Sequence, residues 1–96
     1  MTDSPGCARI ISPADWGVDL GITEGEGSCR EIVGPSTGAV TRSLYWIELL
    51  AGSRTLSMKH RGEAVYYVVS GDVRVESETC PPLQLSEGGM FHVRPA

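Results

Sequence analysis

Clusters of glycine, proline and small polar residues interrupt this chain at short intervals, and their spacing limits what it can fold into. They lie at residues 24–28, 34–38, 51–53, 70–72, 80–82 and 87–89. Glycine supplies positive φ angles and proline removes a backbone donor, so each cluster breaks regular structure. The segments between them are short and rich in β-branched and aromatic residues, which is typical of strands. We therefore predict an all-β fold, either a sandwich or a barrel.

The strand prediction covers most of the chain. The predicted strands are residues 8–11, 18–22, 29–33, 42–50, 55–60, 64–70, 73–77, 83–85 and 90–94. Residues 13–16 can form one helical turn, and no longer segment has helical periodicity. The chain has no internal repeat and no linker, and 96 residues is the size of one domain. We therefore predict a single domain over residues 1–96.

Alternation along two neighbouring segments predicts an inward-facing histidine. Successive side chains of a strand point to opposite faces, so Leu56, Met58 and His60 share one face of segment 54–60. Segment 64–70 is apolar on both faces and is predicted to be a central strand that is covered on both sides. His60 would then point inwards beside Met58. An imidazole in that place can bind a metal ion, exchange a proton or hydrogen-bond inside the core, and the sequence leaves these alternatives open.

Charge and cysteine content exclude several classes of function. The net charge is −4, and the eight lysines and arginines are scattered, so no basic surface for nucleic acid is expected. No apolar run approaches the roughly 18 residues of a membrane span. Cys7, Cys29 and Cys80 fit neither a disulfide framework nor a zinc motif. With no signal-peptide pattern at the start of the chain, we expect a cytoplasmic protein with reduced thiols.

Residues 52–71 resemble the first sequence motif of the cupin superfamily. That motif has a Gly, two His separated by one residue, a Glu, and a closing Gly. Gly52, His60 and Gly71 fall in register, whereas Met58 stands at the first His position and Ala64 at the Glu position. Cupins are small barrels of the double-stranded β-helix or jelly-roll type that hold a metal ion or small molecule in the lumen. The resemblance therefore implies a cupin-like barrel for this chain.

The last residues resemble the start of the second cupin motif. Residues 88–96 match its beginning, and the final His of that motif has no counterpart before Ala96. The resemblance implies a barrel that is short at its C-terminus. His92 lies on the strand before that position, and alternation groups it with Met90 and Arg94 on one face, opposite Phe91. The sequence does not decide which of these faces points inwards.

A narrower stretch resembles ectoine synthases, which are metal-dependent cupins. Lys59-His60 followed by Glu63-Ala64-Val65-Tyr66 matches their corresponding run. The resemblance implies that Glu63 is a metal ligand, because the Glu of this run binds iron in that family. Glu63 would face the lumen only if a β-bulge within residues 64–70 reversed the alternation. The family's Tyr ligand corresponds to Phe91, and its His ligand would lie beyond Ala96.

Three functions are predicted from these patterns. The first is a small cupin-like protein that binds a small organic ligand in its lumen through His60, Glu63, Met58 and Tyr66, without a complete metal site. The second is a metal-dependent lyase or cyclase resembling ectoine synthase, with iron, manganese or zinc held by His60 and Glu63. The third is a non-catalytic dimerising module. We expect a small molecule and a second copy of the chain, in a homodimer, as the partners.

Overall fold

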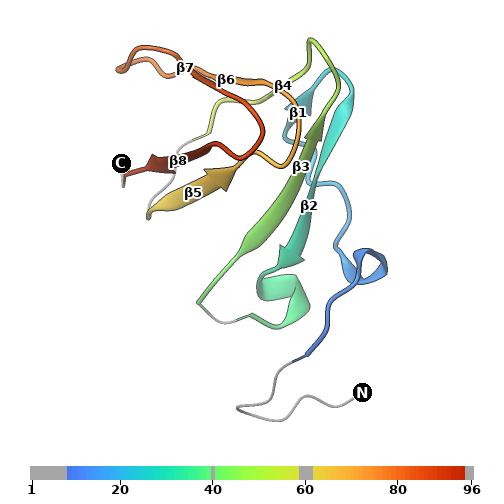
Figure 1. The fold of residues 1–96 in the computed structure, drawn as a ribbon. Coiled ribbons are helices and arrows are strands. Elements are labelled where there is room, and N and C mark those ends of the chain that lie inside the picture. Colours follow the sequence, from blue (N-terminus) through green and yellow to red (C-terminus); the bar gives the residue numbers. More distant parts are fainter. Residues whose placement is uncertain (1–8, 40, 59–61, 95–96) are drawn as a thin grey trace. The chain divides into compact units, whose positions relative to one another are not determined.

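The computed structural model describes residues 9–39, 41–58 and 62–94 (Figure 1). The chain divides into two units, Met1–Ser57 and Met58–Ala96, and each contains strand pairs of its own. The sequence predicted a single domain over residues 1–96, and that these two units act as one domain stays a prediction. No helix among the described residues is long and apolar enough to cross a membrane.

The first unit is built on an antiparallel pair of strands, β2 (Gly27–Val33) and β3 (Leu44–Leu49). Residues 17–20 lie along the other edge of β2, because the Gly17 amide donates to the Glu31 carbonyl and the Leu20 amide to the Cys29 carbonyl, both at 2.8 Å. Strand β2 therefore has neighbours on both edges. Its residues Cys29 and Glu31 are buried, and a register shift follows Glu31 in the ladder.

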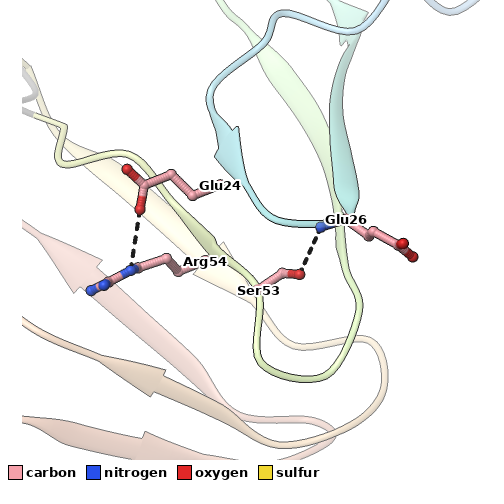
Figure 2. Close-up of polar contacts among 4 residues, drawn as sticks. All are labelled: Glu24, Glu26, Ser53 and Arg54. Atoms are coloured by element: carbon pink, nitrogen blue, oxygen red, sulfur yellow. Dashed lines mark hydrogen bonds and ion pairs between the residues drawn. The ribbon is translucent and has the colours of Figure 1, made fainter.

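A second strand pair in this unit joins β1 (Thr23–Glu24) to β4 (Arg54–Thr55). Figure 2 shows its two polar contacts: Glu24 pairs with Arg54 at 3.3 Å, and the Glu26 amide donates to the Ser53 hydroxyl at 2.9 Å. Gly25 has a φ of +86°, and a Cβ there would lie 2.5 Å from the Ser53 hydroxyl oxygen. This turn therefore needs glycine both for its backbone conformation and for the space.

Two short 3₁₀ helices complete the first unit: η1 (Pro13–Asp15) and η2 (Pro35–Thr37). The first confirms the predicted helical turn, and Asp15 closes it by accepting from the Ser12 amide at 3.0 Å. The second is tied to β2, because the Glu31 carboxylate accepts from the Ser36 amide at 3.1 Å and from its hydroxyl at 2.7 Å. The buried carboxylate thus has hydrogen-bond partners.

The second unit contains two antiparallel strand pairs. Strand β5 (Ala64–Tyr67) pairs with β8 (Met90–Val93), and β6 (Val73–Val75) pairs with β7 (Leu83–Leu85). The amide of Val68 donates to the Gly89 carbonyl at 2.9 Å and continues the first pair beyond its ladder. Positive φ angles at Gly71 and Gly88 mark turns between these strands. Two of the predicted turn clusters therefore fall where the chain reverses.

The all-β prediction is confirmed, with shorter strands than the sequence indicated. Six of the predicted segments contain a strand (29–33, 42–50, 64–70, 73–77, 83–85 and 90–94). Of the described residues 55–58 only Thr55 lies in a strand, β4, and segment 18–22 retains a single bridge at Asp19. Residues 9–11 form no strand. The described strands pair two by two, and they do not close into a barrel.

The prediction of a central strand covered on both sides is wrong for the described part of the chain. Among the described strands β5 pairs only with β8, and its side chains Val65 and Tyr67 are exposed. An apolar run shows only that side chains can be buried, and the neighbours of the strand decide whether they are. The ladder from Ala64 to Tyr67 is regular, so no bulge lies within it. A register shift occurs instead in β2, between Glu31 and Val33.

Candidate functional site

The β5–β8 ladder divides the predicted site residues between two faces. Val65 lies opposite His92, and Tyr67 lies opposite Met90, so these four residues share one face. Ala64, Tyr66, Phe91 and Val93 occupy the other face, and all four are half-buried. The exposed face is therefore the one that carries His92. Alternation alone had left open whether the His92 face or the Phe91 face of this strand points inwards.

Glu63 and His92 meet on the exposed face. Glu63 stands two residues before Val65, so its side chain leaves the chain on the same face as His92. The distance from Glu63 Oε2 to His92 Nε2 is 3.4 Å. Both side chains are open to solvent, at 68% for Glu63 and 49% for His92. A carboxylate that accepts hydrogen bonds thus lies beside an imidazole that can donate or accept them.

A stacked aromatic pair supports this arrangement from the opposite face. Tyr66 and Phe91 are direct partners in the ladder, and their rings stack with centroids 4.5 Å apart and planes 3° from parallel. Aromatic pairs across strands stabilise the register in which they meet. Because Phe91 adjoins His92 in β8, the stack helps to keep the His92 imidazole at the level of Glu63.

The structure brings some predicted site residues together and separates others. Glu63 and Tyr66 lie on opposite sides of the ladder, so within this sheet one small ligand on the Glu63 face does not touch the Tyr66 ring. Met58 is described and exposed, whereas His60 lies outside the described residues. The pairing of Glu63 with His92 was not predicted. Alternation in the sequence already grouped Met90, His92 and Arg94 on one face. Without the strand register, it could not show that Glu63 lies beside His92.

Glu63 and His92 are two side chains of the types that bind divalent metals, and the described structure brings them together. Two donors of one tetrahedral zinc, with bonds of about 2.0–2.1 Å, lie about 3.3 Å apart, which agrees with the Glu63–His92 separation. A protein site usually needs about three such donors. Among the described residues no group of three or more His, Cys, Asp or Glu side chains could hold a metal ion. The donors that are described therefore do not complete the predicted iron, manganese or zinc site.

A second polar cluster, in the first unit, has a structural role. The Arg30 guanidinium donates to the carbonyls of Gly17 at 2.8 Å, Trp16 at 3.2 Å and Pro13 at 3.3 Å. It also lies 5.3 Å from the centroid of the Trp16 ring, which is 5.6 Å from the ring of Trp46. These contacts hold residues 13–17 against β2. With its donors directed at backbone carbonyls, Arg30 is a poor candidate for binding a ligand.

The described cysteines are free thiols with different environments. Cys29 is buried, and burial raises the pKa of its thiol, with the nearby Asp19 carboxylate as a smaller cause in the same direction. Cys80 is exposed. The thiolate is the reactive form, so both burial and the raised pKa disfavour Cys29 as a nucleophile. Cys7 lies outside the described residues.

Comparisons of the chain with protein-family models, with curated proteins and with solved structures found no match. The cupin and ectoine synthase resemblances therefore stay predictions from the sequence motifs. The approach of Glu63 to His92 on the exposed face of β5–β8 is a property of the fold itself and does not depend on them.

Proposed function

We propose that this protein binds a small organic ligand on the exposed face of the β5–β8 pair, at the end where Glu63 meets His92. The observation that carries the proposal is the 3.4 Å approach of the Glu63 carboxylate to the His92 imidazole on a face that is open to solvent. Binding sites for small molecules combine a few convergent polar groups with apolar surface. Val65 and Tyr67 supply the apolar surface next to this pair.

The polar groups define the kind of ligand. Glu63 accepts hydrogen bonds from a donor such as an amide, hydroxyl or ammonium group, and His92 can donate to or accept from an adjacent atom. The ligand would carry such a polar end and a short apolar body. His60 and Met58 belong to the proposal through the sequence motif alone. Tyr66 contributes indirectly, because its stack on Phe91 holds β8 in register.

A titration followed by amide NMR tests the proposal. ¹⁵N-labelled protein is titrated with a panel of small amino acids, amides, carboxylates and amines, in a buffer that contains EDTA. We expect at least one compound to shift the amide signals of Val65 and His92. Glu63→Gln and His92→Gln should each weaken that binding about tenfold or more, which corresponds to the loss of a hydrogen bond to a charged or polar partner.

The chain offers a matched control for the loss of the carboxylate. Arg74 and Glu76 form an exposed ion pair of 3.1 Å, with its arginine on β6. Glu76→Gln removes the same charge at a similar exposure and should leave ligand affinity unchanged. If no compound shifts these signals, or if the shifts lie away from β5 and β8, the proposal is wrong. Repeating the titration with zinc in place of EDTA would show whether a metal ion contributes.

A further inference from the structure

The spacing of Glu63 and His92 limits which polar group a ligand can present to both of them. Glu63 Oε2 lies 3.4 Å from His92 Nε2, whereas N–H···O hydrogen bonds are usually about 2.7–3.2 Å long. Both atoms belong to the second unit, and the β5–β8 register places the strands that carry them, so this separation is a property of that unit alone. The pair is loose enough for Oε2 to accept from a bound group while the Nε2–H of His92 donates to it.

Groups that offer a single polar atom, or polar atoms of one kind, fit this spacing poorly. An oxygen with hydrogen bonds of about 2.8 Å to both Oε2 and Nε2 would hold them at an angle of only about 75°. A bridging hydroxyl would therefore make at least one bent bond. An ammonium group has donors only, so it serves Glu63 and leaves His92 without an acceptor. A carboxylate has acceptors only, and it is repelled by the charge of Glu63.

A primary carboxamide fits both groups at once. Its nitrogen and oxygen lie about 2.3 Å apart, given C=O and C–N bonds of about 1.23 and 1.33 Å. Hydrogen bonds of about 2.9 Å from these two atoms to groups 3.4 Å apart tilt by only about 11° each from parallel, so both stay close to linear. The amide N–H donates to Glu63 Oε2, and the Nε2–H of His92 donates to the amide carbonyl. A trans secondary amide points its N–H and C=O in opposite directions and cannot make both bonds.

We propose that the ligand of this site is a primary carboxamide with a short alkyl chain, held by Glu63 and His92 through its two amide atoms. The inference rests on the proposed function and narrows it to one functional group. Val65 is the ladder partner of His92, and Tyr67 follows on the same face about 7 Å further along β5. The alkyl chain lies over these two side chains, which are 61% and 59% exposed.

Four compounds of equal chain length test the inference on the unaltered protein. Pentanamide, N-methylpentanamide, pentanoate and pentylamine are each titrated into the ¹⁵N-labelled chain in a buffer that contains EDTA, and the amide signals of Val65 and His92 are followed. Pentanamide should bind at least about tenfold more tightly than the other three, because it alone makes both hydrogen bonds. N-methylpentanamide is the matched control, since it keeps the chain and the carbonyl and replaces the N–H on the carbonyl side with a methyl group.

His92→Phe tests which residue donates to the carbonyl. It keeps an aromatic ring in β8 and removes the Nε2–H, so the affinity for pentanamide should fall about tenfold, whereas that for pentylamine, which needs only Glu63, should stay the same. Equal binding of pentanamide and N-methylpentanamide, or an unchanged affinity of His92→Phe for pentanamide, overturns the inference. If another compound then still shifts Val65 and His92 in the unaltered chain, the proposed function stands without it. If no compound shifts these signals, both are wrong.

Discussion

Replacing Arg30 with methionine should loosen the first unit far more than the same change at Arg54. Arg30 donates three hydrogen bonds to the carbonyls of residues 13–17, two of them partly buried, and its guanidinium lies over the Trp16 ring. Methionine keeps the unbranched apolar stem and removes every one of these polar contacts. The substitution therefore separates the polar contribution of Arg30 from its packing.

The expected loss can be worked out from the individual contacts. The bond of 2.8 Å to the Gly17 carbonyl should contribute about 1.5 kcal/mol, the low end for charged donors. The longer bond of 3.2 Å to the Trp16 carbonyl should contribute about 1 kcal/mol, as an ordinary hydrogen bond does. The cation–π contact adds about 0.5 kcal/mol at a site open to water. We assign little to the exposed bond to Pro13. Water will solvate the freed carbonyls in part, so Arg30→Met should lower the free energy of unfolding by about 2–3 kcal/mol.

Tryptophan fluorescence during urea unfolding reports this loss directly. Both tryptophans of the chain, Trp16 and Trp46, belong to the first unit and contact each other. With a urea dependence of about 1 kcal/mol per molar for a small unit, the midpoint should fall by about 2 M or more. Arg30→Lys keeps the positive charge but loses the planar guanidinium with its several donors. It should therefore lower the urea midpoint less than Arg30→Met does.

Arg54→Met is the control, because its ion pair with Glu24 is exposed on both sides (75% and 56%). Surface pairs of this kind contribute about 0–1 kcal/mol, so the midpoint should move little. Equal shifts for the two substitutions, or a smaller one at Arg30, would refute the assignment of Arg30 as the residue that fastens residues 13–17 to β2.

Three further predictions concern the first unit and the thiols. Gly34→Ala should lower its stability by about 1–3 kcal/mol in the same urea assay, because a Cβ there would collide with the buried Glu31 carboxylate. The Cys29 amide, and after it a second backbone amide, holds the pKa of Asp19 below its usual value. The contribution of Asp19 to the free energy of unfolding is therefore complete above its unfolded pKa of about 3.9. This contribution is lost as the pH falls through the lower pKa that Asp19 has in the folded state. Asp19→Asn should destabilise the unit at neutral pH, and its difference from the unaltered chain should shrink as the pH falls below the unfolded pKa of about 3.9. In a thiol-labelling experiment at neutral pH, Cys80 should react quickly and Cys29 only when the unit unfolds.

Each of these predictions has an outcome that contradicts it. A Gly34→Ala chain as stable as its parent would mean that the Glu31 carboxylate can move aside at no cost. A difference between Asp19→Asn and its parent that stays constant as the protein is acidified would exclude the carboxylate as the titrating group. Labelling of Cys29 at the rate of Cys80, with Cys7 replaced by serine, would show that β2 opens in the native state.

Local chemistry explains why the class of fold could be predicted. Glycines such as Gly71 and Gly88 adopt positive φ, a conformation that other residues rarely take, so the turn positions can be found without knowledge of the neighbours. The segments between turns have the β-branched and aromatic composition of strands. The predicted segment 83–85 is a strand in full, and 29–33 lies within β2.

Within the described part of the chain, the strands that shortened or were lost have few neighbours to pair with. Segment 55–60 has the alternation of a strand, yet of its described residues, 55–58, only Thr55 lies in a ladder, opposite Thr23. Alternation describes which side chains share a face, and a ladder also needs a second chain segment at hydrogen-bonding distance. The same reason applies to the covered central strand: the apolar pattern of β5 could not show that β8 would be its one described partner.

The sequence by itself determined the local features of this protein: where the chain turns, that it forms strands, and that Met90 and His92 share a face. The tertiary structure decided what depends on contacts between distant segments. The register that sets Val65 opposite His92 brings Glu63 to the imidazole, 29 positions away along the chain, and puts Tyr66 on the other side. The same ladder leaves Val65, Tyr67 and Met90 exposed on the face that carries His92. The physical reason is that alternation has a period of two residues, whereas strand register fixes which residues of two segments meet.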